Sequence, residues 1–153
     1  MPDTIDQPEI TGLYFQLFNE IGIISQLSRA MFEARLPDGL LLTHFTVINH
    51  LIRVKDGQTP LVLARAFQVP KTSMTHTLAG LEKRGLIEMR ANPEDARSKQ
   101  VWLTDAGRAF RDQAIAGMAP DVHQVSDALD PADVELITSK LEILRKRLDA
   151  ARD

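Results

Sequence analysis

The chain has 153 residues, a formal net charge of -3 and no cysteine. This length fits one domain, or a small domain with extensions, and is enough to bury a core. The lack of cysteine excludes disulfides and thiolate metal sites within the chain. No apolar stretch approaches the roughly 20 residues that span a bilayer, so we expect a cytoplasmic protein with no membrane partner.

The charge is unevenly distributed along the chain. Residues 54–103 hold eight basic and five acidic residues, a net charge of +3, whereas residues 1–53 and 104–153 each have a net charge of -3. A locally basic segment is typical of nucleic-acid binding. A net of +3 is equally compatible with an ordinary solvated surface, so charge alone leaves both interpretations open.

Long helices are expected at both ends. After a polar arm at residues 1–7, apolar residues at helical spacing from Ile10 to Leu27 predict a helix that ends before Pro37. A last helix is predicted to start at Asp130-Pro131. Its apolar seam, spaced by three and four residues, would pack on another helix, either within the monomer or in a second copy. The seam consists of Val134, Ile137, Leu141, Leu144, Leu148 and Ala151.

Two short helices are predicted between these ends, after a second helix that Thr43 is expected to cap. Thr59-Pro60 has the pattern of a cap followed by a first helical proline, which predicts a third helix to about Phe67. Gln68 to Pro70 then interrupt the pattern, and Pro70 can serve as the first residue of a fourth helix. Two short helices joined by a turn of three or four residues form a helix-turn-helix.

Residues 71–104 read as the fourth helix followed by a hairpin. Met74, Leu78 and Leu81 mark one buried stripe, and Gly85 ends the helix. Residues 86–90 and 99–103 have strand-like composition and are joined by a charged loop. The open side of the helix then carries small polar and basic side chains: Lys71, Thr72, Ser73, Thr75 and His76. Such a helix followed by a basic hairpin suits contact with a duplex.

Two further features follow the hairpin pattern. Trp102, the only tryptophan, alternates with apolar neighbours, which fits a place on the outer face or a partly buried one equally well. Thr104 is expected to cap a fifth helix that is interrupted near Pro120. The inward residues of that helix are expected to be Ala106, Phe110, Ala114 and Met118.

Three motifs resemble those of MarR-type winged helix-turn-helix regulators. Asp95-Ala-Arg97 followed by Leu103-Thr-Asp-Ala-Gly107 resembles their Asp-x-Arg…Leu-Thr-x-x-Gly signature, residues 74–87 resemble their recognition helix, and residues 42–45 resemble the start of their second helix. Gln68 departs from the family pattern, which usually has glycine in the turn, and Pro70 stands where a Ser/Thr cap is common.

The resemblance implies a mainly α fold with a small two-stranded antiparallel β-wing. It places a winged helix-turn-helix lobe at residues 43–107 and a helical dimerisation region at residues 8–36 and 108–153. The implied partners are double-stranded DNA with a pseudo-palindromic operator and a second copy of the chain, so that the protein acts as a homodimer. In the family, such proteins are most often ligand-responsive repressors.

The resemblance also assigns DNA contacts. The first turn of the recognition helix would enter the major groove, Thr75 and His76 would reach base edges, and Arg97 would enter the minor groove with Asp95 fixing the loop. A solvated helix surface and a weak surface ion pair are the alternatives for these residues. The remaining basic candidates would contact phosphates: Arg65, Arg84, Arg90 and Lys99.

A small aromatic or phenolic effector is the last implied partner. Its site would be formed by Phe18, Gly22, Ser25, His44, Phe45 and Ile48, although an ordinary hydrophobic core explains these residues at least as well. No cofactor, metal site or enzymatic activity is expected, since the histidines are not clustered and no phosphate loop or nucleophile elbow is present. The competing interpretation is a winged helix that serves protein interaction or DNA architecture without a ligand.

Overall fold

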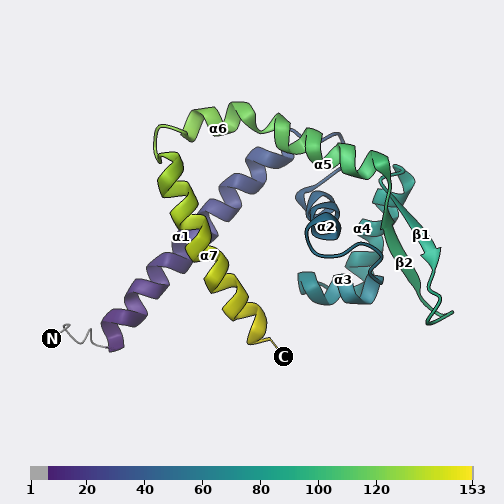
Figure 1. Ribbon diagram of the computed structural model, residues 1–153. Coiled ribbons are helices and arrows are strands. Elements are labelled where there is room, and N and C mark those ends of the chain that lie inside the picture. Colours follow the sequence, from purple (N-terminus) through teal and green to yellow (C-terminus); the bar gives the residue numbers. More distant parts are fainter. Residues whose placement is uncertain (1–6, 153) are drawn as a thin grey trace. The chain divides into compact units, whose positions relative to one another are not determined.

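The computed structural model describes residues 7–152, which divide into two compact units, unit 1 up to Gly117 and unit 2 from Met118 (Figure 1). Unit 1 contains α1 (Gln7–Glu33), α2 (Leu42–Arg53), α3 (Pro60–Phe67), α4 (Lys71–Lys83), β1 (Ile87–Ala91), β2 (Lys99–Leu103) and α5 (Asp105–Gly117). Unit 2 contains α6 (Ala119–Val125) and α7 (Pro131–Ala150). The fold is therefore mainly α with one two-stranded antiparallel sheet, as predicted.

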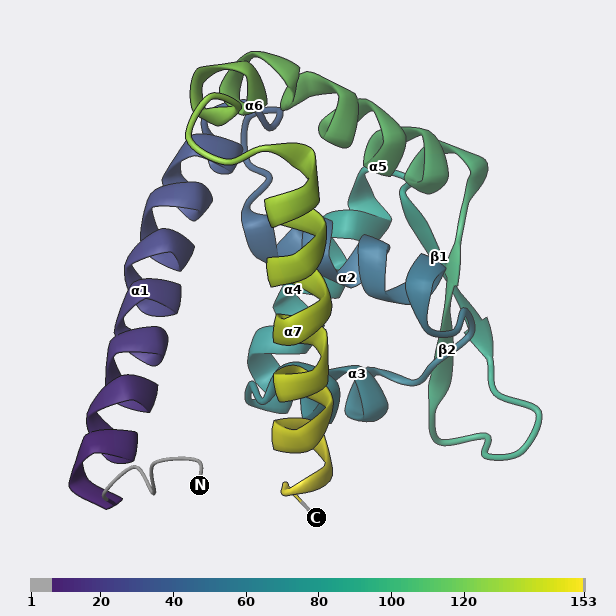
Figure 2. The ribbon, with the colours of Figure 1, turned by 60° about the vertical axis from the view of Figure 1, so that its left-hand side comes forward.

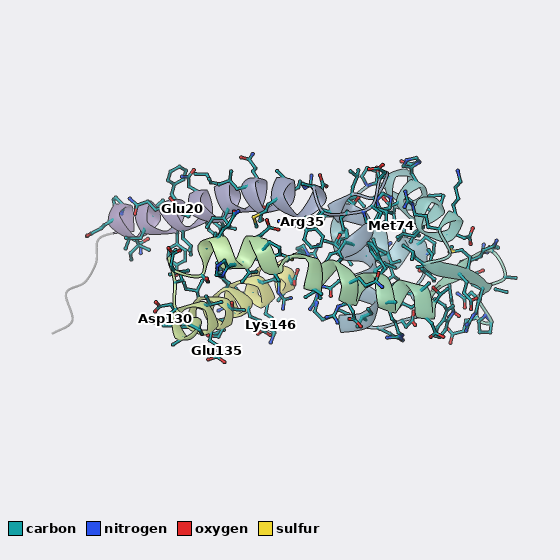
Figure 3. All side chains as sticks on the ribbon, turned by 90° about the horizontal axis from the view of Figure 1, so that it is seen from above. Glu20, Arg35, Met74, Asp130, Glu135 and Lys146 are labelled. Atoms are coloured by element: carbon teal, nitrogen blue, oxygen red, sulfur yellow. The ribbon has the colours of Figure 1, made fainter. Side chains whose placement is uncertain are left out.

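The core of unit 1 lies where α2, α3 and α4 meet the hairpin. The predicted stripe of α4 is confirmed, because Met74, Leu78 and Leu81 are all buried; Met74 is labelled in Figure 3 within the helical part of the unit. Ile48 and Leu63, from the two preceding helices, have no exposed surface. Burial of these aliphatic side chains, at about 1.5–3 kcal/mol each, holds the helix-turn-helix together.

The hairpin pairs Ile87 with Leu103 at its base and Ala91 with Lys99 at its far end. Val101 is fully buried on the inner face of the hairpin. On the edge of β2 away from β1, Gln58 forms an antiparallel bridge with Val101. The Val101 N–H donates to the Gln58 carbonyl at 2.8 Å, and the Val101 carbonyl accepts from the Gly57 N–H at 3.0 Å. The base of the wing is thus fastened to the segment between α2 and α3.

The start of α2 differs from the prediction. The helix begins at Leu42 with Leu41 as its cap residue, so Thr43 lies inside the first turn and does not cap it. Side chains from elsewhere satisfy the first amides instead. The Leu41 N–H donates to Nδ1 of His44 at 2.9 Å, and the Leu42 N–H donates to the Glu33 carboxylate at 2.9 Å. The side chains of His44 and Glu33, and not the Thr43 hydroxyl, therefore accept hydrogen bonds from the amides at the start of α2.

The turn between α3 and α4 explains why a glycine is usual at residue 68. Gln68 has φ 52° and ψ 45°, a left-handed conformation that glycine adopts without strain. Thr59 caps α3 as predicted, accepting the Val62 N–H at 3.3 Å. Pro70 is the cap residue of α4 and the helix starts at Lys71, one residue later than the proline-first prediction.

The start of α5 is a joint between helix and wing. Thr104 is the predicted cap, and its hydroxyl accepts the Gly107 N–H at 3.0 Å while donating to the Gly85 carbonyl at 2.6 Å. The prediction that Ala106 faces inward is wrong, because Ala106 is exposed and Gly107 is buried. A Cβ at residue 107 would lie 2.1 Å from the Leu86 carbonyl oxygen, so the helix turns its glycine toward the chain that leaves α4.

The two long helices bury little of their apolar surface within one chain. In α1 only Phe32 is buried, and in α7 no residue is. Asp130, labelled in Figure 3, caps α7 as predicted by accepting the Asp133 N–H at 2.8 Å. No helix in residues 7–152 is long and apolar enough to cross a membrane. The exposed apolar residues of α1 include Leu13, Tyr14, Phe15, Leu17, Phe18, Ile23, Ile24 and Leu27.

Candidate nucleic-acid interface

The first turn of α4 presents an uninterrupted polar face. The stripe of Met74, Leu78 and Leu81 fixes the rotation of the helix, and the residues between them therefore point outward. The first four amides of a helix lack partners within it, so this end favours negative charge. The five residues predicted to contact DNA from α4 are all exposed: Lys71, Thr72, Ser73, Thr75 and His76.

The hydroxyl of Thr75 is already engaged in the helix. It donates to the Lys71 carbonyl at 2.9 Å, and the hydroxyl of Thr77 does the same to the Ser73 carbonyl at 3.1 Å. With its proton committed, the Thr75 oxygen can only accept a hydrogen bond from outside, and its methyl group is free for apolar contact. Such a side chain suits the thymine methyl or an amino group on a base edge.

The wing loop between β1 and β2 is held by its own side chains. Asn92 donates through Nδ2 to the Ser98 hydroxyl at 2.9 Å and accepts the Glu94 N–H at 3.0 Å. The Asp95 carboxylate accepts the Arg97 N–H at 3.0 Å and also pairs with the Arg97 guanidinium at 3.3 Å. The Arg97 side chain nevertheless remains 92% exposed. The loop is thus ordered while its arginine stays available.

The start of α4 and the tip of the wing lie toward the same side of unit 1. In both Figure 1 and Figure 2, α3, which leads into α4, and the loop between β1 and β2 lie at the lower edge of unit 1. Lys99 is exposed at the far end of the hairpin, and Arg65 is exposed in the last turn of α3. The fold therefore brings these predicted contacts to one side.

The Arg90 side chain is held by contacts within the wing. Its guanidinium lies 4.9 Å from the centre of the Trp102 ring and pairs with Glu88. Gly57 lies against the same ring, because a Cβ there would come within 2.5 Å of it. Trp102 is half-buried, and its indole Nε1 is buried without a hydrogen-bond partner among the described residues. Of the two placements left open for Trp102, the structure shows the packed one.

Arg84 is separated from the other predicted DNA contacts. It is the cap residue at the C-terminal end of α4, opposite the end that presents the polar face. Its Nη2 donates to the Asp38 carbonyl, and a Cβ at Gly39 would lie 2.8 Å from the same atom. The side chain therefore faces the loop between α1 and α2, and we leave it out of the interface.

One structural residue escaped prediction. Asp56 accepts the N–H groups of Gly57 and Leu103, each at 3.0 Å, and its other oxygen lies 3.7 Å from the Arg108 guanidinium. It thereby connects the segment before α3 with the end of β2 and the start of α5. An Asp-Gly pair in a turn was the only sequence signal, and it indicates a turn without revealing distant partners.

The predicted effector residues fall into two groups that differ in burial. Phe18, Gly22 and Ser25 are exposed on α1, whereas Ile48 is fully buried. Phe45 packs between the rings of Phe32 and Phe110, with ring centres 4.6 and 6.3 Å away. The residues from α2 thus belong to the core of unit 1, which was the alternative interpretation.

His44 belongs to the same packed region. It is buried, its Nδ1 accepts the Leu41 N–H, and its Nε2 would lie 3.1 Å from a Cβ at Gly80 in the recognition helix. Burial, with smaller contributions from the charges of Arg84 and His76, lowers the pKa of His44 below its usual value. The neutral ring is the form that can accept the amide, so the fold stabilises it.

Unit 1 also contains a groove that none of the six predicted effector residues lines. Its volume is about 490 Å³, and it lies between the loop after α1, the end of α4 and the first half of α5. Its walls are mostly apolar, and Arg84 alone among its described lining residues carries a charge. They are Pro37, Leu40, Arg84, Leu86, Ala106, Ala109, Phe110 and Gln113.

Known proteins share this architecture. A family model described as MarR family matches residues 38–98, which contain the helix-turn-helix and most of the wing. A probable transcriptional regulator from Pseudomonas aeruginosa is 25% identical, with 86% of this chain and 98% of that chain covered and a TM-score of 0.67. A solved structure of MarR is 20% identical, with 99% of this chain and 97% of that chain covered and a TM-score of 0.78, which shows the shared fold.

A third comparison includes nucleic acid. A cysteine-to-serine variant of MarR from E. coli, solved in complex with operator DNA, is 26% identical, with 87% of this chain and 93% of that chain covered and a TM-score of 0.66. The motif match, the shared winged-helix fold and the similarity along most of the chain agree with one another. By the family-model match over residues 38–98 and the likeness to solved regulators along most of its length, the chain resembles the MarR family of winged helix-turn-helix transcriptional regulators.

Proposed function

We propose that this protein is a sequence-specific DNA-binding regulator that acts as a homodimer on a pseudo-palindromic operator. The observation that carries the proposal is the exposed polar first turn of α4 on the same side of unit 1 as an ordered wing loop ending in an exposed arginine. The operator complex of the E. coli relative supports this use of the fold.

The chemistry divides the contacts into two kinds. Lys71 and the free amides at the start of α4 would hold phosphates, while Thr75 and His76 would meet base edges in the major groove. Arg97 would enter the minor groove, where a narrow A·T tract concentrates negative potential. Arg65 and Lys99 would add phosphate contacts. Arg90 would serve mainly to brace the wing, because its guanidinium lies over Trp102 and pairs with Glu88.

The unpartnered helices support the homodimer. The exposed apolar side chains of α1 recur along the whole helix, and α7 adds Val134, Ile137 and Leu148. A soluble monomer rarely exposes apolar surface in such quantity, so a second copy is the proposed partner for these helices. Two winged-helix lobes would then bind two half-sites and double a footprint that is small for one lobe.

The proposal is tested by fluorescence anisotropy of labelled DNA from upstream of the gene, with random duplex as competitor and several salt concentrations. We expect binding that random DNA does not displace. Arg97→Ala should weaken it about tenfold and lower the slope of log K against log salt by about one, because one cationic contact is lost. Lys83→Ala is the matched control, because Lys83 is exposed at the other end of α4 and should leave both quantities nearly unchanged.

Other results would contradict specific parts of the proposal. Equal affinity for operator and random duplex would contradict sequence specificity and favour an architectural role. No DNA binding at all would favour a winged helix that serves protein interaction. An Arg97→Ala variant with the wild-type affinity and salt slope would show that the wing does not contact DNA. Sedimentation of a monomer at micromolar concentration would contradict the homodimer.

Repression and response to an effector form the finer part of the proposal. A dimer bound over a promoter would block transcription, and an effector would release it by binding more tightly to the conformation that does not fit the operator. A reporter fused to the upstream region tests the direction: deletion of the gene should raise expression. A fall in expression would identify an activator.

A further inference from the structure

We infer that Trp102 is a positioning residue for DNA binding, because its indole ring fixes the angle at which the wing projects from the helix-turn-helix. The ring does not touch the duplex and acts through Arg97, which the wing loop carries. Only the DNA readout of this inference rests on the proposed function. The mechanical part, a wing held at one angle by an aromatic ring, follows from contacts within unit 1.

The ring of Trp102 has a neighbour on each side of β2. On the edge away from β1, a Cβ at Gly57 would come within 2.5, 2.8 and 2.9 Å of three indole atoms, so the Gly57 backbone lies directly against the ring. On the β1 side, the Arg90 guanidinium lies 4.9 Å from the ring centre, within the range of a cation–π interaction. Glu88, which pairs with Arg90, is the strand partner of Trp102. The ring therefore connects the segment between α2 and α3 with β1.

The wing changes from buried to exposed along its length. Ile87 and Val101 are buried near its base, whereas Ala91 and Lys99, at the far ends of the two strands, are exposed. A two-stranded ribbon twists more than a wide sheet, and a hairpin without further contacts is only marginally stable. A fixed base therefore does not by itself determine where the loop points. The half-buried indole extends from the base as far as Arg90, and so it limits the twist.

Two features indicate that the surroundings of Trp102 suit a flat ring. Gly57 has a φ of 73°, in the left-handed region, and the ring occupies the space that a Cβ would need, so glycine is required there on two counts. The indole Nε1 is buried without a hydrogen-bond partner among the described residues, which is unfavourable. The flat surface of the side chain, and not its polar group, therefore accounts for its place.

A change of wing angle would be felt at Arg97. The bonds from Asn92 to Ser98 and from Asp95 to Arg97 order the loop, so that it moves together with the strands. A hydrogen bond is lost when its atoms separate by less than about 1 Å beyond the usual distance. A small rotation of the hairpin would thus remove the Arg97 contact without unfolding the loop that presents it.

The first test is a pair of double-mutant cycles on operator affinity, measured by anisotropy. Trp102→Leu removes the flat ring and is combined in turn with Arg97→Ala and with Lys71→Ala. Lys71 is the matched partner, because it is an exposed cation at the start of α4 and not on the wing. Trp102→Phe is the control that keeps a flat ring and removes the unpaired N–H. Circular dichroism confirms that each variant is folded, and Trp102→Met replaces Trp102→Leu if the latter is not.

We expect Trp102→Leu to weaken operator binding about tenfold, because the misdirected wing no longer brings Arg97 to the duplex. In that background the loss from Arg97→Ala should shrink to under about twofold, whereas the loss from Lys71→Ala should keep its full size. Trp102→Phe should stay within about twofold of the wild type. Losses that multiply in both cycles, or in neither, would overturn the positioning role, as would a Trp102→Phe protein as weak as Trp102→Leu.

The second test needs no DNA. The chain has no cysteine, so Ala79→Cys in α4 and Ala96→Cys in the wing loop, both at exposed positions, can each carry a spin label. Labelled chains are diluted with excess unlabelled protein, and double electron–electron resonance measures the distance between the two labels. We expect a narrow distribution in the wild type and in Trp102→Phe, and a broader or displaced one in Trp102→Leu. An unchanged distribution in Trp102→Leu would overturn the inference.

Together the two tests separate this inference from the proposed function. A protein that binds no operator, and whose distance distribution broadens in Trp102→Leu, would contradict the proposed function and support the hold of the ring on the wing. A protein that binds operator through Arg97, and whose distribution is the same with and without the ring, would contradict the role of Trp102 alone.

Discussion

Replacing Gly107 by alanine tests the joint at the base of the wing. In an unobstructed helix this change gains up to about 1 kcal/mol, because glycine has the larger conformational freedom in the unfolded chain. Here the new Cβ would lie 2.1 Å from the Leu86 carbonyl oxygen and 3.2 Å from its carbon, whereas ordinary contacts lie at 3.4–4 Å. Backbone atoms must therefore move, since no flexible side chain can yield.

The expected cost follows from that displacement. Overpacking that forces backbone shifts costs about 1–3 kcal/mol, which outweighs the helix gain and leaves a net loss of about 1–2 kcal/mol. The shift would also act on Thr104, whose hydroxyl caps Gly107 and bonds to the Gly85 carbonyl. The operator affinity should fall together with the stability, because the joint positions the wing relative to α4.

Urea unfolding followed by circular dichroism measures the effect, at one protein concentration because dimerisation contributes to apparent stability. Gly117→Ala is the matched control in the same helix, since a Cβ there meets nothing within 4 Å; it should be neutral or slightly stabilising. A Gly107→Ala protein as stable as the Gly117→Ala protein would refute the close approach of Leu86 to α5, and with it our explanation of the motif glycine.

Three further predictions concern single side chains. Gln68→Gly should raise the free energy of unfolding by up to about 1 kcal/mol, because it relieves the left-handed φ of 52°; a lower urea midpoint would contradict this. Arg90→Ala should move the emission of Trp102 to longer wavelength by uncovering its ring, and an unchanged spectrum would show that the two do not stack. Burial lowers the pKa of His44 and His50 below 6.5, so the unfolded chain takes up protons first. The free energy of unfolding should therefore fall as the pH drops through about 6.5 and level off at lower pH. His44→Asn should flatten the urea-midpoint profile, and a wild-type profile without slope would contradict the reasoning.

The sequence predicted most of the fold because its local signals agreed with one another. The spacing of Met74, Leu78 and Leu81 defined both the buried stripe of α4 and its open face, and Gly85 and Asp130 marked helix boundaries that the structure confirms. The family motifs added the order of the elements. Helices and turns of this kind depend on neighbours within a few residues, which a single sequence displays directly.

The errors arose where partners are distant in sequence. The first amides of α2 are satisfied by His44 and by Glu33, which lies nine residues from its partner, so a threonine at the right spacing was misleading. Apolar periodicity predicted that Ala106 faces inward, whereas the buried residue is its neighbour Gly107. Periodicity does not show that the Leu86 carbonyl leaves room only for a glycine at this place. The contact of Arg84 with Asp38 and the groove beside it were not predicted, since the two residues lie 46 positions apart.

The side-chain hydrogen bonds that order the wing loop should affect the thermodynamics of the proposed DNA binding. Ordering a backbone residue costs about 1–2 kcal/mol in conformational entropy, and a disordered loop would incur that loss when it meets the duplex. In this protein the bonds among Asn92, Asp95 and Ser98 order the loop when the chain folds. On the proposed binding, the rotamers of exposed side chains such as Arg97 and Lys99 would remain to be fixed, but not the loop backbone. The wing should therefore contribute to affinity without a large entropic opposition and with little change in heat capacity.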